Sequence, residues 1–141
     1  DYSGSRGLGD VYKRQDKLLE ISHFLALGQI ELARNNYLKA IDYFNVAVDI
    51  QDALPYREPE FWYYPTRQSL GHALMLNKNF EEAVKVFNKD LENYPRNGWS
   101  FYGLHKAHQS LENNNQSQDA LNKFKEIWQF SDVELKSSVI Y

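Results

Sequence analysis

The fold is decided by YYPTRQSLGHALMLN (residues 63–77), followed after two residues by FEEAVKVFNKDLENYP (residues 80–95). Apolar residues recur in both segments at spacings of three and four, which is the period of a helix with one buried face. Pro65 lies near the expected start of the first helix, where its missing N–H does no harm, and Pro95 is expected to end the second. The short polar link between the segments predicts an antiparallel helix pair.

Small residues occupy matching positions on the two predicted helices. Gly71 and Ala83 allow the two backbones to approach closely, and Phe87 follows one turn after Ala83. A similar order recurs in two more copies, through Leu27, Gly28, Ala40 and Phe44 in the first and Leu104, Ala120 and Phe124 in the third. Internal repetition of a helix pair predicts a helical solenoid.

The spacing of the copies locates an insertion. Leu70 and Leu104 lie 34 residues apart, whereas Leu27 and Leu70 lie 43 residues apart, so nine residues are added between the first two copies. The added residues fall in QDALPYREPEFWY (residues 51–63). Insertions in solenoids gather on one face, which is often the binding face.

This order of small and aromatic residues resembles the tetratricopeptide repeat over residues 21–130. The resemblance implies an all-α fold, a right-handed superhelix of three antiparallel helix pairs at about residues 16–50, 64–94 and 97–130, in a repeat domain of residues 16–131. The third copy departs from the pattern, because His105 stands where the other copies have glycine and ENNNQSQ (residues 112–118) is expected to lengthen its turn. We therefore expect the third pair to be splayed or to have a longer first helix.

A closer resemblance rests on three stretches, DALPYREPEFWYYPTRQSLGHAL (residues 52–74), FNKDLENYPRNGWSFYGL (residues 87–104) and FSDVEL (residues 130–135). They are similar to the C-terminal part of a group of longer bacterial tetratricopeptide proteins without an assigned activity. The resemblance implies a non-catalytic scaffold module, a C-terminal fragment of a longer array, whose partner is a protein or an extended peptide. Residues 132–141 are then a C-terminal tail, expected to lie extended on the last helix.

The first fifteen residues have a different character. Residues 5–15 back-translate in one frame to an adapter used in transposase-based sequencing libraries, and eleven consecutive residues are too many for a chance match. We therefore expect residues 1–15 to be an artefactual disordered tail that adds no stability, in a sequence of metagenomic or draft-assembly origin. The natural N-terminus is then expected to be missing.

Composition excludes several classes of protein. The 141 residues are 43% hydrophobic with a formal net charge of −3 and no cysteine. This suits one domain with a core, gives no pull toward nucleic acid, and excludes disulfides and thiolate metal sites. No apolar run approaches the roughly 18 residues that a membrane span needs. We expect no nucleic-acid partner, no membrane span and no cofactor, and the compartment stays open between cytoplasm and periplasm.

The insertion is rich in aromatic residues between prolines. Phe61 and Trp62 are expected to point inward as anchors, because Pro59 and Pro65 fix the backbone on either side. Its charged residues are expected to face water: Arg57, Glu58 and Glu60. Two interpretations of the aromatic residues stay open. They fill the gap between repeats as core, or they form a partly open patch for a peptide, a sugar or a small ligand.

In the resembling repeats, the first helix of each pair lines a concave groove. Mapping those inner rows onto this chain, and adding Tyr63 at the end of the insertion and Arg67 one helical turn after it, gives the predicted binding site: Tyr63, Arg67, Gln68, His72, Trp99, Tyr102 and Lys106. Arginine and aromatic anchors dominate the binding energy of such patches. Because the inner rows carry one lysine and are otherwise mostly neutral, a clamp for the terminal carboxylate of a peptide is disfavoured.

The third copy carries a candidate metal site. His105, His108 and Glu112 share one helix face, and two histidines with one carboxylate can bind Zn²⁺ or Fe²⁺. His108 aligns with Leu74, a packed position, so we predict no metal site.

The insertion carries two candidate catalytic carboxylates. Glu58 and Glu60 flank its aromatic residues, but an exposed carboxyl group with a pKa of about 4 is a poor general acid or base at neutral pH. No nucleophile stands beside a base, so we predict that the chain is not an enzyme. Two rivals stay open: the C-terminal part of an enzyme or small-ligand-binding protein whose active region lies in a missing N-terminal portion, and a structural cap without a binding patch.

Overall fold

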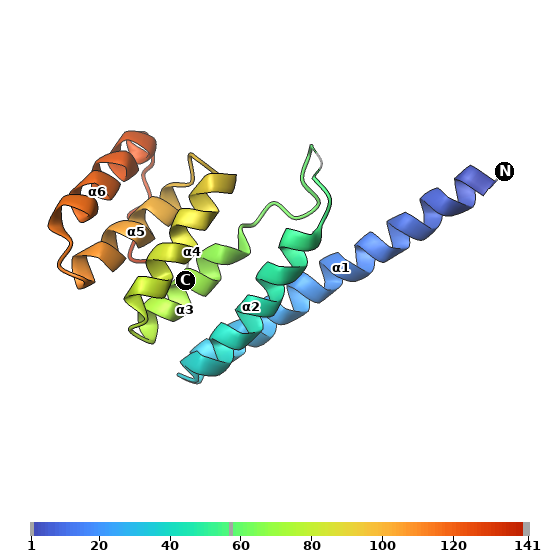
Figure 1. Cartoon of the computed structure of the whole chain (residues 1–141), viewed down its shortest axis with the longest axis horizontal. Helices are drawn as coiled ribbons and strands as arrows, with labels where there is room; N and C mark the ends of the chain where they lie inside the picture. Colours follow the sequence, from blue (N-terminus) through green and yellow to red (C-terminus); the bar gives the residue numbers. More distant parts are fainter. Residues whose placement is uncertain (1, 57, 140–141) are drawn as a thin grey trace.

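The computed structural model describes residues 2–56 and 58–139, and every regular element in this part of the chain is an α-helix. The six helices are α1 (Tyr2–Ala33), α2 (Tyr37–Ala53), α3 (Thr66–Leu76), α4 (Phe80–Asn93), α5 (Gly98–Ser110) and α6 (Asn114–Trp128). They pack sequentially in pairs, as Figure 1 shows. The predicted all-α fold of three helix pairs is confirmed, and its arrangement is consistent with a tetratricopeptide-like solenoid.

The two helices of every pair are joined by the same turn. Asn35, Lys78 and Glu112 have φ angles of 61°, 61° and 60°. In the first turn the N–H of Asn36 donates to the carbonyl of Glu31 at 2.9 Å, and the equivalent bonds in the other turns measure 2.8 and 2.9 Å. These are Schellman caps, which satisfy the last carbonyl groups of a helix. The three positive-φ residues are 43 and 34 residues apart, the two periods found in the sequence.

The third turn is not lengthened. Three residues join α5 to α6, as three residues join α1 to α2 and α3 to α4. The asparagines that follow Glu112 belong to the cap and first turn of α6, so the expected longer turn was wrong. The first helix of this pair is longer, with 13 residues in α5 against 11 in α3.

Two phenylalanine rings fill the contacts within the first two pairs. Phe44 and Phe87 are fully buried. A Cβ atom on Gly28 would lie 2.3 Å from the ring of Phe44, and one on Gly71 would lie 2.3 Å from the ring of Phe87. A Cβ atom on Gly103 of α5 would lie 2.4 Å from the same Phe87 ring. Phe87 therefore packs between α3 and α5 and joins the second pair to the third.

The third pair replaces this packing with a polar contact. His105 stands in the glycine position, and its Nδ1 lies 2.9 Å from the Oγ of Ser117 on α6. Phe124 is only half-buried, and its ring packs against Tyr102 with the ring centroids 5.2 Å apart.

The beginning of the chain is helical in the described range. Helix α1 starts at Tyr2, so residues 2–15 differ from the disordered tail that we expected. Figure 1 shows this part of α1 projecting beyond α2. The guanidinium carbon of Arg14 lies 5.0 Å from the centroid of the Phe61 ring, which connects α1 to the insertion.

The tail takes a path other than the expected one. Residues 131–139 form no helix or strand. The Nε1–H of Trp128 on α6 donates to the carbonyl of Val133 at 2.7 Å, so the first part lies on the last helix as expected. The chain then returns to α3, where Ser138 bonds to Gln68, and the expectation was wrong for this second part (Figure 1). Residues 140–141 lie outside the described residues.

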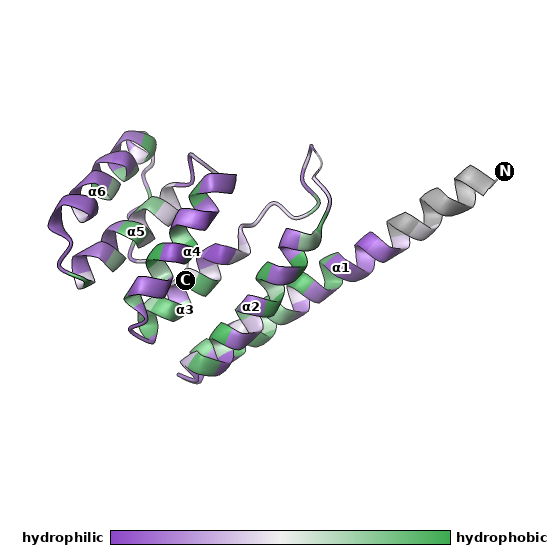
Figure 2. Cartoon of the chain, viewed as in Figure 1, coloured by the Kyte–Doolittle hydropathy of each residue, from purple (hydrophilic) through white to green (hydrophobic). Residues whose placement is uncertain are grey.

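Charged residues cover the outer surface of the second helix of a pair. On α4, Lys85 pairs with Glu82 and Lys89 pairs with Glu92, each at 2.7 Å, and all four side chains are exposed. Figure 2 shows hydrophilic residues along α4 and α6, interrupted by hydrophobic ones. None of the described helices combines the length and the apolar character that crossing a bilayer requires.

Candidate functional site

The base of the insertion is fixed by one side chain. Gln51, near the end of α2, accepts hydrogen bonds from the N–H of Thr66 at 3.0 Å and from its hydroxyl at 2.6 Å. Its Nε2 donates to the carbonyls of Trp62 and Tyr64 at 3.3 and 3.2 Å. One glutamine therefore holds both the end of the insertion and the start of α3.

The aromatic residues of the insertion divide by exposure. Phe61 and Trp62 are half-buried, and the buried Nε1 of Trp62 has no hydrogen-bond partner among the described residues. Tyr63 is 88% exposed. Both glutamates are exposed, although Glu60 accepts a hydrogen bond from the hydroxyl of Tyr94 at 2.9 Å. Arg57, which we expected to face water, lies outside the described residues.

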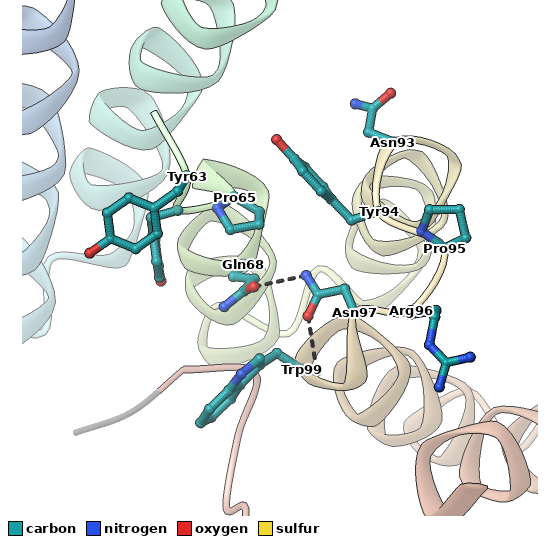
Figure 3. A pocket seen from close by; sticks show the side chains of 10 residues that line it. Tyr63, Pro65, Gln68, Asn93, Tyr94, Pro95, Arg96, Asn97 and Trp99 are labelled. Carbon is teal, nitrogen blue, oxygen red and sulfur yellow. Dashed lines mark hydrogen bonds between the residues drawn. The ribbon is translucent and has the colours of Figure 1, made fainter. Parts of the chain in front are cut away.

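A cavity of about 720 Å³ lies where the insertion, the α4–α5 connection and the start of α5 meet (Figure 3). We call this cavity the mouth. It is lined by Tyr63, Tyr64, Pro65, Gln68, Asn93, Tyr94, Pro95, Arg96, Asn97 and Trp99. Aromatic and proline rings make up six of these ten residues, and the other four carry amide or guanidinium groups. Ligand sites in proteins have this combination of apolar walls and few polar groups.

A buried hydrogen-bond network fixes one wall of the mouth. Asn97 caps α5, because its side-chain oxygen accepts from the N–H of Trp99 at 3.1 Å. Its Nδ2 donates to Gln68 at 2.8 Å and to Asp90 at 2.7 Å. Asp90 is 1% exposed and also accepts from the hydroxyl of Ser100 at 2.5 Å. The network ties α3, α4 and α5 together behind the mouth.

Burial is the largest cause of the raised pKa values of two groups near the mouth. It raises the pKa of the Asp90 carboxyl, and the hydrogen bonds from Ser100 and Asn97 counteract part of that rise. Burial, followed by the hydrogen bond to Glu60, raises the pKa of the Tyr94 hydroxyl, which stays protonated at neutral pH. Arg96 is exposed at the edge of the mouth, where it adds a positive charge.

The structure brings together three of the seven predicted site residues. Tyr63, Gln68 and Trp99 line the mouth. Arg67 does not, because it forms two hydrogen bonds to the carboxylate of Asp52, at 2.7 and 2.5 Å. It lines a separate cavity of about 450 Å³ under the insertion. The guanidinium that we expected to meet a partner is held within the chain.

The other three predicted residues also lie outside the mouth. His72 follows Gln68 by one helical turn, and burial lowers the pKa of its imidazole. Tyr102 packs against α6 through Phe124, and the Nζ of Lys106 donates to the side chain of Gln109 at 2.9 Å. His72 lies on α3, and Tyr102 and Lys106 lie on α5, in each case further along the helix than the residues that line the mouth.

The α4–α5 connection was not predicted as part of the site. The segment Asn93, Tyr94, Pro95, Arg96 and Asn97 contributes half of the lining residues. The signal in the sequence was a helix end followed closely by a helix start, because Pro95 predicts the end of one helix and Asn97 predicts the start of the next. Because the connection between α4 and α5 is short, it must pass close to the start of α3, which the end of the insertion precedes.

The two histidine side chains on α5 contact nearby polar groups of the same helix pair. His105 Nδ1 lies 2.9 Å from the Ser117 hydroxyl, and His108 Nδ1 lies 3.4 Å from the Nδ2 of Asn113. Glu112 is the left-handed residue of the turn. Among residues 2–56 and 58–139, no three histidine or carboxylate side chains group as a metal site.

Comparison with known proteins supports the helical-repeat interpretation. No protein-family model matches the chain. Nuclear autoantigenic sperm protein of Bos taurus, which contains tetratricopeptide repeats, is 31% identical over 87 residues. The match covers 58% of this chain but only 11% of the bovine protein. The chain is therefore a helical repeat domain that resembles part of a tetratricopeptide protein.

Proposed function

We propose that this chain is a non-catalytic protein-interaction module, and that the mouth binds an extended segment of a partner protein. The observation that carries the proposal is Tyr63, which is 88% exposed at the rim of an aromatic-lined cavity of about 720 Å³. Large aromatic side chains supply much of the binding energy at protein interfaces.

The second support is that the mouth is preformed. The buried network around Asn97 fixes the start of α5, and Gln51 fixes the end of the insertion. Little conformational entropy is then lost on binding, which increases affinity.

The openness of Tyr63 favours a peptide over an enclosed small molecule. A small-ligand pocket usually buries most of its ligand. Here one wall is the exposed ring of Tyr63, so a ligand gains contact area when it extends over that ring. An extended peptide can do this. Asp90, whose carboxylate accepts a hydrogen bond from the mouth residue Asn97, is 1% exposed and held by two donors, so it supports the architecture and is closed to a substrate.

A peptide library displayed on phage and selected against the intact chain tests this function. Selected peptides should bind wild type, and Tyr63→Ala should weaken binding roughly tenfold or more. Tyr56→Ala is the matched control, because Tyr56 is 83% exposed on the same insertion but does not line the mouth. The proposal fails if no peptide is enriched, or if the two variants bind selected peptides equally well.

A further inference from the structure

The tail is attached to the helices at few points. Six consecutive exposed residues, 129–134, lead away from α6, and Phe130 is 93% exposed. Within this stretch two hydrogen bonds reach the last residue of α6: the N–H of Ser131 donates to the carbonyl of Trp128 at 2.9 Å, and the Nε1–H of Trp128 donates to the carbonyl of Val133 at 2.7 Å. Sparse contacts of this kind mark segments that detach at low free-energy cost.

The tail then becomes buried although it forms no helix or strand. Leu135, Ser138 and Val139 are 8%, 3% and 6% exposed, whereas Lys136 between them is exposed. Two aliphatic side chains and one small hydroxyl side chain thus anchor the segment, and its charged side chains face outward. Bound peptides commonly show this division between anchors and solvent-facing residues.

The polar anchor is a reciprocal pair of hydrogen bonds. The hydroxyl of Ser138 donates to the backbone carbonyl of Gln68 at 3.1 Å, and the Nε2 of Gln68 donates to the carbonyl of Ser138 at 3.4 Å. The two residues are 70 positions apart in the sequence, and Gln68 is 5% exposed. On the tail, the contact uses only a backbone carbonyl and one short side chain, so a different chain with serine at this point can reproduce it.

The anchored tail adjoins the mouth. Gln68 bonds to the tail and also lines the mouth. Trp99 lines the mouth, and its ring packs edge-to-face on Trp128 at 5.3 Å, while Trp128 holds the carbonyl of Val133. Figure 3 draws the backbone of the tail in the same view as Trp99 and Gln68. Gln68, Trp99 and Trp128 are called the tail-binding surface below.

We propose that the tail-binding surface is a peptide-binding site and that residues 131–139 are its internal ligand. The partner is an extended segment with the same anchor pattern, an aliphatic residue, two variable residues, a serine and an aliphatic residue, and it displaces the tail. This inference rests on the proposed function and adds the chemistry of the partner and its competition with the tail. A tethered segment meets its site at an effective concentration on the order of millimolar, so the tail weakens the binding of a partner.

Two variants of the full chain test the competition. Val139→Asp places a charge at a 6% exposed anchor and should release the tail, whereas Val133→Asp changes a 48% exposed side chain and should not. The probe is a labelled peptide with the sequence of residues 131–141. It should bind Val139→Asp about tenfold more tightly, or better, than it binds wild type or Val133→Asp. Equal binding to all three chains, or no binding to a helical Val139→Asp chain, overturns the proposal.

A second experiment applies if Val139→Asp does not fold. A protease site between Phe130 and Ser131, within the exposed stretch, allows the tail of the folded chain to be cut. The cut tail should then exchange for the labelled peptide while the helical circular dichroism is retained. A cut tail that never exchanges, or a chain that unfolds when the tail leaves, contradicts the proposal.

The outcomes separate this inference from the proposed function. Among the described residues, Tyr63 forms no hydrogen bond with the tail, which bonds to α3 at Gln68. Tyr63→Ala introduced alongside Val139→Asp should therefore leave binding of the tail peptide unchanged. If the tail peptide fails to bind while library peptides depend on Tyr63, only the internal-ligand inference falls. If the tail peptide binds while the library yields nothing, the mouth is not the partner site and the proposed function falls.

Discussion

Phe87 is the side chain on which the packing of the second and third pairs converges. It is fully buried, with Gly71 of α3 on one side and Gly103 of α5 on another. Neither glycine has a positive φ, so both are needed for the space that they leave and not for backbone freedom. A ring enclosed in this way cannot move aside for a larger neighbour.

Gly71→Leu should therefore lower the free energy of unfolding by about 1–3 kcal/mol or more. A Cβ atom alone would lie 2.3 Å from the ring of Phe87, and leucine adds three further carbons. The measurement is urea denaturation. Gly9→Leu is the control, because a Cβ atom at Gly9 has nothing within 4 Å and should not lower stability. A Gly71→Leu chain as stable as wild type would contradict the repeat register.

Asp90 makes stability depend on pH. Burial raises the pKa of its carboxyl in the folded chain, so the folded chain keeps a proton that the unfolded chain has already released. The stability that this protonation provides is present below the unfolded pKa of about 4, and it is lost as pH rises through the folded pKa.

Asp90→Asn should remove this dependence. The free energy of unfolding of wild type, measured relative to the variant by denaturation at a series of pH values, should fall as pH rises from about 4 through the raised pKa. The absolute difference also contains the changed hydrogen bonds to Asn97 and Ser100, so the slope is the diagnostic quantity. A constant difference, or one that grows in favour of wild type with rising pH, would contradict the assigned shift.

At the scale of elements, the turns within the pairs are uniform although none contains glycine. Lys78 holds a φ of 61°, a region in which a side chain is strained. Lys78→Gly should raise the free energy of unfolding by roughly 0.5–1 kcal/mol, because the strain removed exceeds the freedom added to the unfolded chain.

The control for this prediction has the opposite sign. Lys85→Gly places glycine in the interior of α4 and should lower stability by about 1 kcal/mol, since the exposed ion pair of Lys85 with Glu82 contributes little. Thermal denaturation of both variants decides the comparison. If both substitutions destabilise the chain, the Schellman geometry of the turn is wrong.

The helix pairs could be predicted from sequence because their determinants are local. The small residues, the wedge at Phe87 and the position of the insertion all appear as spacing along the chain. The site was only partly predictable. The sequence predicts Arg67 as a free cation, but its partner Asp52 lies on the other side of the insertion in the sequence. No local pattern shows that the two residues meet. The contact between Ser138 and Gln68, which are 70 residues apart, likewise has no local signal in the sequence.

At the scale of the whole molecule, the projecting start of α1 stands apart from the packed helices (Figure 1). The described side chains before Arg14 are exposed, and Tyr12 is 64% exposed. Deletion of residues 1–13 should leave the melting temperature unchanged within error. Extending the deletion through Ile21, which is fully buried, should lower it clearly. A fall of several degrees from the shorter deletion would show that this segment packs as part of the domain.

The insertion, the α4–α5 connection and the start of α5 meet at the mouth, where we propose that a partner segment binds. Amide chemical shifts of the labelled chain, recorded while a library-selected peptide is added, test this location directly. We expect the largest changes at Tyr63, Gln68, Asn97 and Trp99, with little change at residues 35–39, where a separate cavity lies at the α1–α2 turn. Changes centred on residues 35–39, with the mouth unaffected at saturation, would contradict it.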